Sequence, residues 1–390
     1  MTSEIAPGKL RPPVWDVQEH NIQQLSKNSQ EAARETLCLS NNQAVKLVEN
    51  LYGFNVESVK KLGSYGDYNF HVKVSGADLE HHEYILKVMN AKDSRDEEQI
   101  TAQTSMMTFL STRDFHVPRP EQNRWGNIMS LVNFERKENG TTVSTDHNVR
   151  LLTYLSGILG SDVTLDPASL YGAGVYMARL HQALKNFDHP GLHRPNFKWN
   201  LRNTSVVGEY LHVLGSIEDQ KMAHKVLDLF ADKVLSRMED LQQGPTHADF
   251  GSGNILVKEK TTNPGPEERY QICGVLDFGD AIWNPLVFDV AISLLFYMLT
   301  APDHEDPTVY SGHFLRGYES VRPLTTAEWD VLYHCVVERA CQLYVLNERA
   351  VSVEPDREAH IRQDCERLYE TLKYLVESPK AEIDKQMLGR

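Results

Sequence analysis

His247–Asn254 reads HADFGSGN, and Val275–Asp280 reads VLDFGD. The apolar runs Asn254–Val257 and Gln271–Leu276 are typical of short strands, and the Gly- and Pro-containing stretch Asn263–Glu267 between them is typical of a loop. We therefore predict a hairpin with one of the two quoted stretches at each end. Either pattern alone recurs by chance, but both in this order around a hairpin are strong evidence for a single site.

The polar residues of the two stretches are those that phosphoryl transfer requires. A carboxylate must orient or deprotonate the acceptor hydroxyl, and metal ligands must neutralise charge on the β- and γ-phosphates. Asp249 fits the first role. Asn254, on the same loop, and Asp277, at the end of the next strand, offer the hard oxygen ligands that Mg²⁺ prefers. The sequence therefore predicts Asp249 as a catalytic base and Asn254 and Asp277 as metal ligands.

Three further residues near these stretches have expected roles. His247 is expected to support the catalytic loop by hydrogen bonding rather than to act as a catalyst. Asp289 lies inside the most apolar run of the chain, Leu286–Met298. Because a buried carboxylate needs partners, Asp289 is expected to bond the backbone of a loop. Trp199 could face a substrate, whereas the adjacent Asn200 is more simply explained as a helix cap.

Upstream of the two stretches, a phosphotransferase needs groups that bind the nucleotide phosphates. The loop Gly63–Phe70, with Ser64 and Asn69, lies between two predicted strands, and its backbone N–H groups could cover phosphates. Taken alone it is an ordinary hairpin turn. Lys87 lies in the apolar strand Tyr84–Val88, where it is either a solvated charge on an edge strand or a phosphate ligand. The downstream motifs favour the ligand.

The order of predicted elements indicates an α+β, bilobed, protein-kinase-like fold with a small β-rich N-lobe and a larger helical C-lobe. We expect a loosely ordered extension at 1–40, the N-lobe at 41–155 and the C-lobe at 156–390. In the C-lobe, Thr325 and Glu328 form a predicted capping box at the start of a long helix. The N-lobe elements are a helix at Asn41–Tyr52, strands at Val56–Leu62, Tyr68–Val74 and Glu83–Val88, a helix at Arg95–Ser111, and strands at Ile128–Phe134 and Val149–Tyr154.

Composition narrows the class of protein. The 390 residues carry 40 basic and 54 acidic side chains, a net charge of −14, so a broad positive field for nucleic acid or an anionic membrane is not expected. The five cysteines are scattered without a C-x-x-C pair, which indicates neither a zinc site nor a disulfide framework. No apolar leader or bilayer-length run is present. We expect a cytoplasmic protein that binds small molecules and has no obligate protein partner.

The motif H-x-D-x4-N, the V-L-D-F-G-D stretch and the segment Pro285–Ala291 together resemble the aminoglycoside phosphotransferase / choline kinase superfamily. The resemblance extends over about residues 41–375. It is closest to the branch whose members phosphorylate 5-hydroxy-L-lysine and use GTP. The segments that carry this closer resemblance are Asn69–Val72, Glu83–Lys87, Arg150–Leu155, Asn196–Leu201, Gly274–Asp280 and Pro323–Thr325.

The resemblance implies that the nucleotide base lies near Leu152, Tyr154 and Leu155, in the connection between the lobes, and that Lys87 contacts the phosphates. It implies Mg²⁺ and either GTP or ATP as phosphate donor. A hydroxylysine substrate carries two ammonium groups, and Asp280 and Glu338 are the candidates for pairing with them, because buried ammonium ions need partners. Alternatives are a kinase of another amino alcohol, such as ethanolamine or choline, and a catalytically weak nucleotide-binding pseudokinase.

Two departures from the family pattern have structural consequences. Relatives usually carry Gly between the His and Asp of the catalytic loop, whereas this chain has Ala248, which would be strained if the position requires a positive φ. The glutamate that pairs with the strand lysine in relatives aligns with Thr101. Glu97 or Glu98, one helical turn earlier, is expected to take its place.

Overall fold

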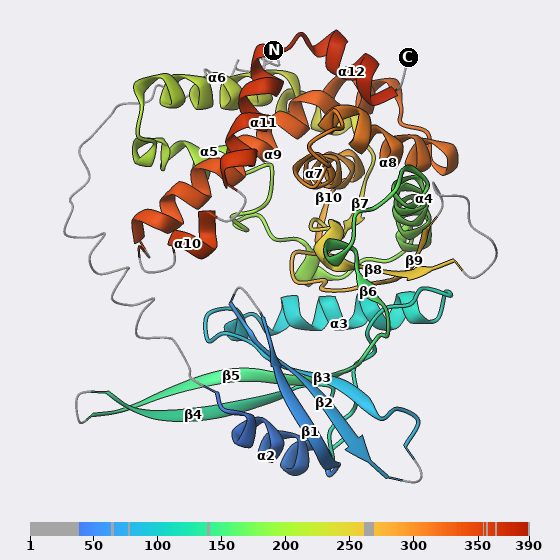
Figure 1. Cartoon of the computed structure of the whole chain (residues 1–390). Helices are drawn as coiled ribbons and strands as arrows, with labels where there is room; N and C mark the ends of the chain where they lie inside the picture. The colour runs from blue at the N-terminus through green and yellow to red at the C-terminus, as the bar shows by residue number, and fades with distance from the viewer. Residues whose placement is uncertain are drawn as a thin grey trace, which may run out of the picture.

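The computed structural model describes residues 39–63, 66–76, 79–138, 141–260, 269–353, 355, 358–362 and 365–388. The predicted phosphate-loop residue Ser64, nearly all of the 1–40 extension and the loop Asn263–Glu267 lie outside this range. The described chain forms a smaller lobe built on a β-sheet and a larger lobe built mainly of helices, with helix α3 between them (Figure 1). The predicted bilobed α+β fold is confirmed.

The smaller lobe is a five-stranded antiparallel sheet with the strand order β1-β2-β3-β5-β4, and α2 packs against it. A capping box between Ser40 and Gln43 begins α2. Ala44, Val48 and Tyr52, four residues apart, turn one apolar face of this helix toward the sheet. The elements are α2 (Asn41–Tyr52), β1 (Asn55–Leu62), β2 (Tyr68–Ser75), β3 (Glu83–Val88), β4 (Ser130–Glu138) and β5 (Thr141–Thr153).

The sheet register determines the surroundings of Lys87. Its strand β3 is the central strand of the sheet, and only 7% of Lys87 is exposed, so this lysine is not a solvated charge on an edge strand. It lies opposite Asn69 on β2 and opposite Arg150 on β5. The three side chains therefore form one row across the sheet, and the row contains two buried cations.

Helix α3 (Glu97–Ser111) belongs by its packing to the larger lobe. Its apolar residues Ala102, Met106, Met107 and Leu110 join the core of the helical lobe rather than that of the sheet. The helix also lies against the short 3₁₀ turn Pro190–Leu192, where a Cβ on Gly191 would stand 2.2 Å from the carbonyl oxygen of Glu98. Only glycine permits this approach. The helix predicted to belong to the N-lobe therefore connects the two lobes.

The larger lobe surrounds α7 (Leu286–Leu299), the apolar run identified in the sequence. Every residue of α7 except Phe296 and Leu299 is buried. The predicted capping box is present, because the Glu328 carboxylate accepts from the Thr325 N–H at 2.9 Å and the Glu328 N–H donates to the Thr325 hydroxyl at 3.2 Å. The other helices are α4 (Pro167–Leu184), α5 (Thr204–Gly208), α6 (Ile217–Lys233), α8 (Pro307–Val321), α9 (Thr326–Val353), α10 (Glu358–Ile361), α11 (Cys365–Glu377) and α12 (Lys380–Leu388).

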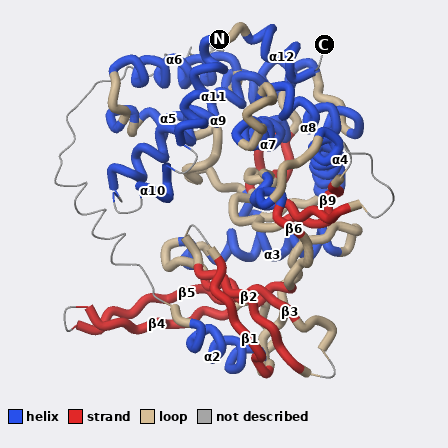
Figure 2. Tube along the Cα trace, viewed as in Figure 1, coloured by secondary structure: helices blue, strands red, loops and turns tan. Residues whose placement is uncertain are grey.

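Two small sheets lie between this helical core and the smaller lobe (Figure 2). One pairs β7 (Gln243–Thr246) with β10 (Ile282–Pro285), and the other contains β6 (Ile158–Leu159), β8 (Ile255–Glu259) and β9 (Tyr270–Val275). The antiparallel pair β8–β9 is the predicted hairpin. No helix in the described ranges is both long enough and apolar enough to cross a membrane.

Candidate active site

The Asp289 side chain, at the start of α7, accepts hydrogen bonds from the backbone of the catalytic loop, residues 247–254. The Asp289 carboxylate accepts from the backbone N–H of His247 at 2.9 Å and from that of Ala248 at 2.8 Å, and it contacts His181 Nε2 at 2.9 Å. Burial raises the pKa of Asp289, but the contact with His181 and the charge of the nearby histidines outweigh burial, and the pKa lies below its usual value. Asp289 thus connects α4, α7 and the catalytic loop.

His247 connects the two motif stretches. Its Nδ1 accepts from the Asp249 N–H at 3.3 Å, so Nε2 carries the proton and donates to the carbonyl oxygen of Leu276 at 2.9 Å. The ring is fully buried and packs on Phe278. Both ring nitrogens are therefore used in holding Asp249 next to Leu276–Asp277.

Asp249 and Asn254 share a direct contact. The Asn254 side-chain amide donates to Asp249 Oδ2 at 2.6 Å and to the Asp249 carbonyl oxygen at 2.9 Å. Burial, followed by the nearby carboxylate of Asp280, raises the pKa of Asp249 well above its usual value. The amide nitrogen of Asn254 is used for Asp249, which leaves its Oδ1 available to a cation.

Asp277 faces Lys87 across the interface between the lobes. The Lys87 ammonium lies 3.3 Å from Asp277 Oδ1 and 3.2 Å from Asp67 Oδ2. Lys87 is the main reason why the pKa of Asp277 falls to about 2, against the opposing effect of burial. Burial alone would lower the pKa of Lys87, but Asp277 and Asp67 raise it above its usual value. Both groups are charged at neutral pH, and 46% of the Asp277 side chain is exposed.

The partner of Lys87 was not the one expected from the sequence. Glu97 and Glu98 are exposed, and Thr101 bonds the carbonyl oxygen of Glu97 within its own helix, so the expectation that Glu97 or Glu98 would pair with Lys87 is wrong. Asp67 takes that position from the loop before β2. The same Asp67 also accepts from the backbone N–H of Asn90 at 3.0 Å, which connects the loop to the end of β3.

Helix α3 contacts the site through neutral side chains. Gln99 Nε2 donates to the carbonyl oxygen of Gly279 at 2.7 Å. Gln103 donates to the same oxygen at 3.4 Å and accepts from Arg150 Nη2 at 2.6 Å. The cation Arg150, buried beside Lys87, is therefore bound by amide and hydroxyl groups of α3, and no glutamate is needed on this face of the helix.

Among the predicted substrate residues, Asp280 and Trp199 both lie near Arg339, whereas Glu338 lies apart from them. Asp280 lies close enough to Asp249 for its charge to raise the pKa of Asp249, and burial raises the pKa of Asp280 itself. Arg339 lies 5.3 Å from the Trp199 ring and donates to the Trp199 carbonyl oxygen at 3.3 Å. Its charge acts on Asp249 and Asp280.

Glu338 is fully buried in α9, and neither carboxylate oxygen has a hydrogen-bond partner in the described chain. Burial raises the pKa of Glu338 well above its usual value, and burial together with Glu338 raises the pKa of the Cys335 and Cys341 thiols. The structure therefore does not bring Glu338 to Asp249. Instead, the structure brings the next residue, Arg339, near Asp249. The sequence did not single out Arg339. Successive helical residues point about 100° apart, and the sequence does not reveal which of the two faces the cleft.

The connection between the lobes carries the residues expected near a nucleotide base. Leu152 is buried and forms a bridge with Pro120. Tyr154 is 38% exposed, and its ring stacks on His71 at 4.3 Å. Leu155 lies against Gly274 of β9. Tyr154 therefore lies beside the sheet and Leu155 beside the β8–β9 hairpin.

Both motif loops contain a residue with a left-handed backbone. Ala248 has φ 61° and Asp277 has φ 47°. Aspartate tolerates this region because its side chain bonds locally, and Asp277 Oδ1 accepts from the Gly279 N–H at 3.1 Å. Alanine has no such compensation, so the backbone at Ala248, where the family resemblance implies glycine, is strained.

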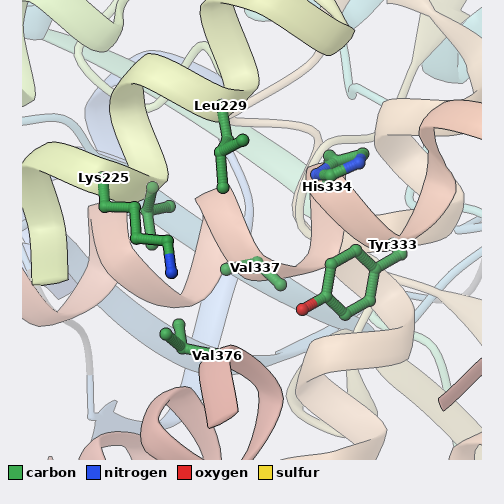
Figure 3. A pocket seen from close by; sticks show the side chains of 7 residues that line it. Lys225, Leu229, Tyr333, His334, Val337 and Val376 are labelled. Atoms are coloured by element: carbon green, nitrogen blue, oxygen red, sulfur yellow. The ribbon is translucent and has the colours of Figure 1, made fainter. Parts of the chain in front are cut away.

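A small cavity of about 50 Å³ lies apart from these residues, between α6, α9 and the end of α11 (Figure 3). Its walls are mostly apolar and include Leu229, Val337 and Val376. None of the predicted site residues contributes to it.

The chemistry of the donor groups fits a hard divalent cation. In the described ranges no three His, Cys, Asp or Glu side chains converge as a metal site. Mg²⁺ in phosphotransferases commonly takes only one or two protein oxygens and completes its shell with phosphates and water. An ionised, half-exposed Asp277 carboxylate and a free Asn254 Oδ1 match that requirement.

Comparison with known proteins agrees with this geometry. A profile of the phosphotransferase enzyme family matches residues 58–324. A hydroxylysine kinase from Xenopus laevis is 35% identical over 353 residues, which cover 89% of this chain and 92% of that protein. A hydroxylysine kinase from Danio rerio is 33% identical over 351 residues, covering 89% and 94%.

Among solved structures, an amicoumacin kinase in complex with AMP-PNP and Ca²⁺ superimposes with a TM-score of 0.62 at 19% identity, over 88% of this chain and 96% of that one. This similarity concerns the fold. The family resemblance inferred from the motifs is confirmed by the matches in sequence. The chain belongs to the phosphotransferase enzyme family and, within it, to the hydroxylysine kinase group of small-molecule kinases.

Proposed function

We propose that this kinase transfers the γ-phosphate of a nucleoside triphosphate to the hydroxyl of 5-hydroxy-L-lysine. The observation that carries the proposal is the convergence of Asp249, Asn254 and the Lys87–Asp277 pair at one site, in a chain whose relatives of similar length are hydroxylysine kinases. We also propose that the N-lobe spans residues 41–155 and the C-lobe residues 156–390, and that the protein is cytoplasmic.

In the proposed reaction, Asp249 accepts a hydrogen bond from the acceptor hydroxyl and takes its proton. The hydroxyl oxygen forms a bond to the γ-phosphorus, the bond from that phosphorus to the β–γ bridging oxygen breaks, and the nucleoside diphosphate leaves with the electron pair. Asn254 holds the Asp249 carboxylate in place. His247 and Asp289 support the loop on which both stand.

Two further groups neutralise the charge of the nucleotide. Lys87 is proposed to contact the phosphates, because Asp67 and Asp277 keep it charged. Mg²⁺, held by Asp277 and Asn254, would neutralise the β- and γ-phosphate oxygens. We propose that Asn69, which lies opposite Lys87 in the sheet, contacts the same phosphates.

For the phosphate donor we propose GTP, with ATP as the alternative. Leu152, Tyr154 and Leu155 supply an apolar edge on which either purine could stack. The preference for GTP rests on the resemblance to the hydroxylysine kinase branch and not on any guanine-specific group among these residues.

The substrate proposal has a charge argument at the reacting end. In 5-hydroxylysine the hydroxyl stands on the carbon next to the one that bears the ε-ammonium. A hydroxyl bound at Asp249 would therefore place that ammonium near Asp280. The charge of an ammonium there would offset the effect of Asp280, which together with burial raises the pKa of Asp249.

A second candidate function is a kinase of a simpler amino alcohol, such as ethanolamine or choline, because the same pair of carboxylates would accept a shorter cation. A degraded, nucleotide-binding protein is less well supported. Asp249, Asn254 and Asp277 are all present, and the missing α3 glutamate is replaced by Asp67.

The deciding experiment measures nucleotide consumption with hydroxylysine, homoserine, ethanolamine and choline, each with GTP and with ATP. We expect hydroxylysine to have the highest kcat/KM. A preference for ethanolamine or choline would keep the phosphotransferase assignment and overturn the hydroxylysine proposal. If no acceptor stimulates consumption by the wild type above that of an Asp249→Asn variant, the protein is not an active kinase of this class.

A further inference from the structure

Arg339, on helix α9, is a buried cation at the acceptor side of the catalytic loop. Only 2% of this residue is exposed. One terminal nitrogen, Nη1, donates to the carbonyl oxygen of Trp199 at 3.3 Å and to Gln342 Oε1 at 2.8 Å. The chain thus fixes one side of the guanidinium with neutral acceptors.

The rest of the guanidinium is not paired. Nε is buried without a hydrogen-bond partner, and Nη2 makes no hydrogen bond with any described residue. No carboxylate of the described chain forms an ion pair with Arg339; Asp249 and Asp280 act on it only at longer range. An unpaired buried charge is costly. A guanidinium with free donors is matched best by an anion such as a carboxylate, which it can bind through two parallel hydrogen bonds.

Two aromatic rings set the position of this cation relative to the reaction. The Arg339 Cζ lies 5.3 Å from the centre of the Trp199 ring and 5.6 Å from that of Phe296. The Phe296 ring in turn packs against Gly251 of the catalytic loop, so closely that a Cβ on that glycine would lie 2.9 Å from Cδ2 of the ring. Phe296 therefore lies close to both Arg339 and the catalytic loop.

We propose that Arg339 is the central residue of a carboxylate-binding subsite, which recognises the α-carboxylate of an amino-acid acceptor whose hydroxyl lies at Asp249. The inference rests on the proposed function and deepens it. Asp249 and Asp280 receive the hydroxyl and the neighbouring ammonium, and Arg339 receives the opposite end of the substrate. The subsite would select hydroxylated amino acids over amino alcohols of the same length.

The first test uses the wild-type protein and two acceptors that differ only by the carboxylate. These are 5-hydroxylysine and its decarboxylated counterpart, 1,5-diaminopentan-2-ol. Hydrogen bonds to charged groups make a difference of at least ~10-fold in binding, so we expect kcat/KM to be at least ~10-fold higher for hydroxylysine, mainly through KM. Equal kcat/KM for the two acceptors would overturn the inference without reference to any variant.

The second test measures the same ratio in Arg339→Gln. We expect the ratio to fall close to one, because only the acceptor with a carboxylate loses a partner, and Arg339→Lys should recover part of it. Arg349→Gln is the matched control: Arg349 lies on the same helix, also has an unpartnered Nε and stacks on Tyr210 at 3.9 Å. If Arg339→Gln slows both acceptors equally, the arginine is only a counter-charge for Asp249 and Asp280, and the inference is wrong.

Different results would contradict the proposed substrate and the proposed carboxylate-binding subsite. If the wild type prefers homoserine to hydroxylysine, the proposed substrate is wrong, and the subsite is then tested by homoserine against 3-aminopropan-1-ol. If ethanolamine or choline is preferred to every acceptor that bears a carboxylate, the substrate and the subsite are both wrong.

Discussion

The catalytic loop and the loop that follows β9 each bring a carboxylate to the same site, but the two carboxylates have opposite properties. Burial and the neighbouring Asp280 raise the pKa of Asp249. Lys87 lowers the pKa of Asp277 to about 2. A carboxylate whose raised pKa favours taking up a proton suits a base, whereas one that is always ionised suits a metal ligand. The sequence of each loop supplies the aspartate, and the cations and anions around it determine its role.

The largest effect is expected from Asp277→Ala. The variant removes the ionised carboxylate, and Mg²⁺-dependent nucleotide binding should be lost altogether. Calorimetric titration with Mg²⁺-nucleotide measures this directly, with the exposed Asp228→Ala on α6 as control. An unchanged dissociation constant would mean that Asp277 merely ends the strand.

Asp249→Asn is expected to act on turnover and not on nucleotide binding. The asparagine can keep the contact with Asn254 but cannot take a proton, so kcat should fall by at least ~10²-fold. Steady-state kinetics give kcat, and titration should give a nucleotide affinity like that of the wild type. Turnover near the wild-type rate would rule out Asp249 as the base.

Asp67→Asn tests the partner of Lys87. The loss of a charged hydrogen bond should raise the KM for nucleotide about 10-fold. Glu98→Gln, which changes an exposed glutamate of α3, is the control and should leave this KM unchanged. If Glu98→Gln raises this KM and Asp67→Asn does not, the ion-pair partner of Lys87 lies on α3 instead.

Asp280→Asn tests the origin of the raised pKa of Asp249. The base must be ionised, so kcat/KM should rise with pH through the pKa of Asp249 in the free enzyme. Removal of the Asp280 charge lowers that pKa. The rising limb of the kcat/KM profile should therefore move to lower pH, even if the plateau value of kcat/KM also changes. A limb that stays in place, as expected for the exposed Asp228→Asn, would assign the raised pKa to burial alone.

The smallest effect is expected from Ala248→Gly. Relief of the positive φ at Ala248 should stabilise the fold by about 1 kcal/mol, seen as a higher thermal midpoint. Ala231→Gly on the exposed face of α6 is the control and should destabilise by roughly 0.5–1 kcal/mol. If both substitutions destabilise the protein equally, the left-handed backbone at Ala248 carries no strain that glycine can relieve.

The sequence by itself determined whatever depends on neighbours along the chain. The α2 helix and the β3 strand begin and end at the predicted residues, because period and capping are local properties. The capping box of Thr325 and Glu328 was predicted from a spacing of three residues. The motif around Asp249, Asn254 and Asp277 was recognisable because one hairpin brings its two halves together.

Only the tertiary structure decided which distant groups meet. It paired Lys87 with Asp67 instead of a glutamate on α3, and it turned α3 into the core of the larger lobe. It also directed Arg339 toward the catalytic loop and left Glu338 buried beside cysteines. The physical reason is that a helical rotation of 100° per residue and the register of a sheet are fixed by packing over the whole molecule, and no local pattern records them.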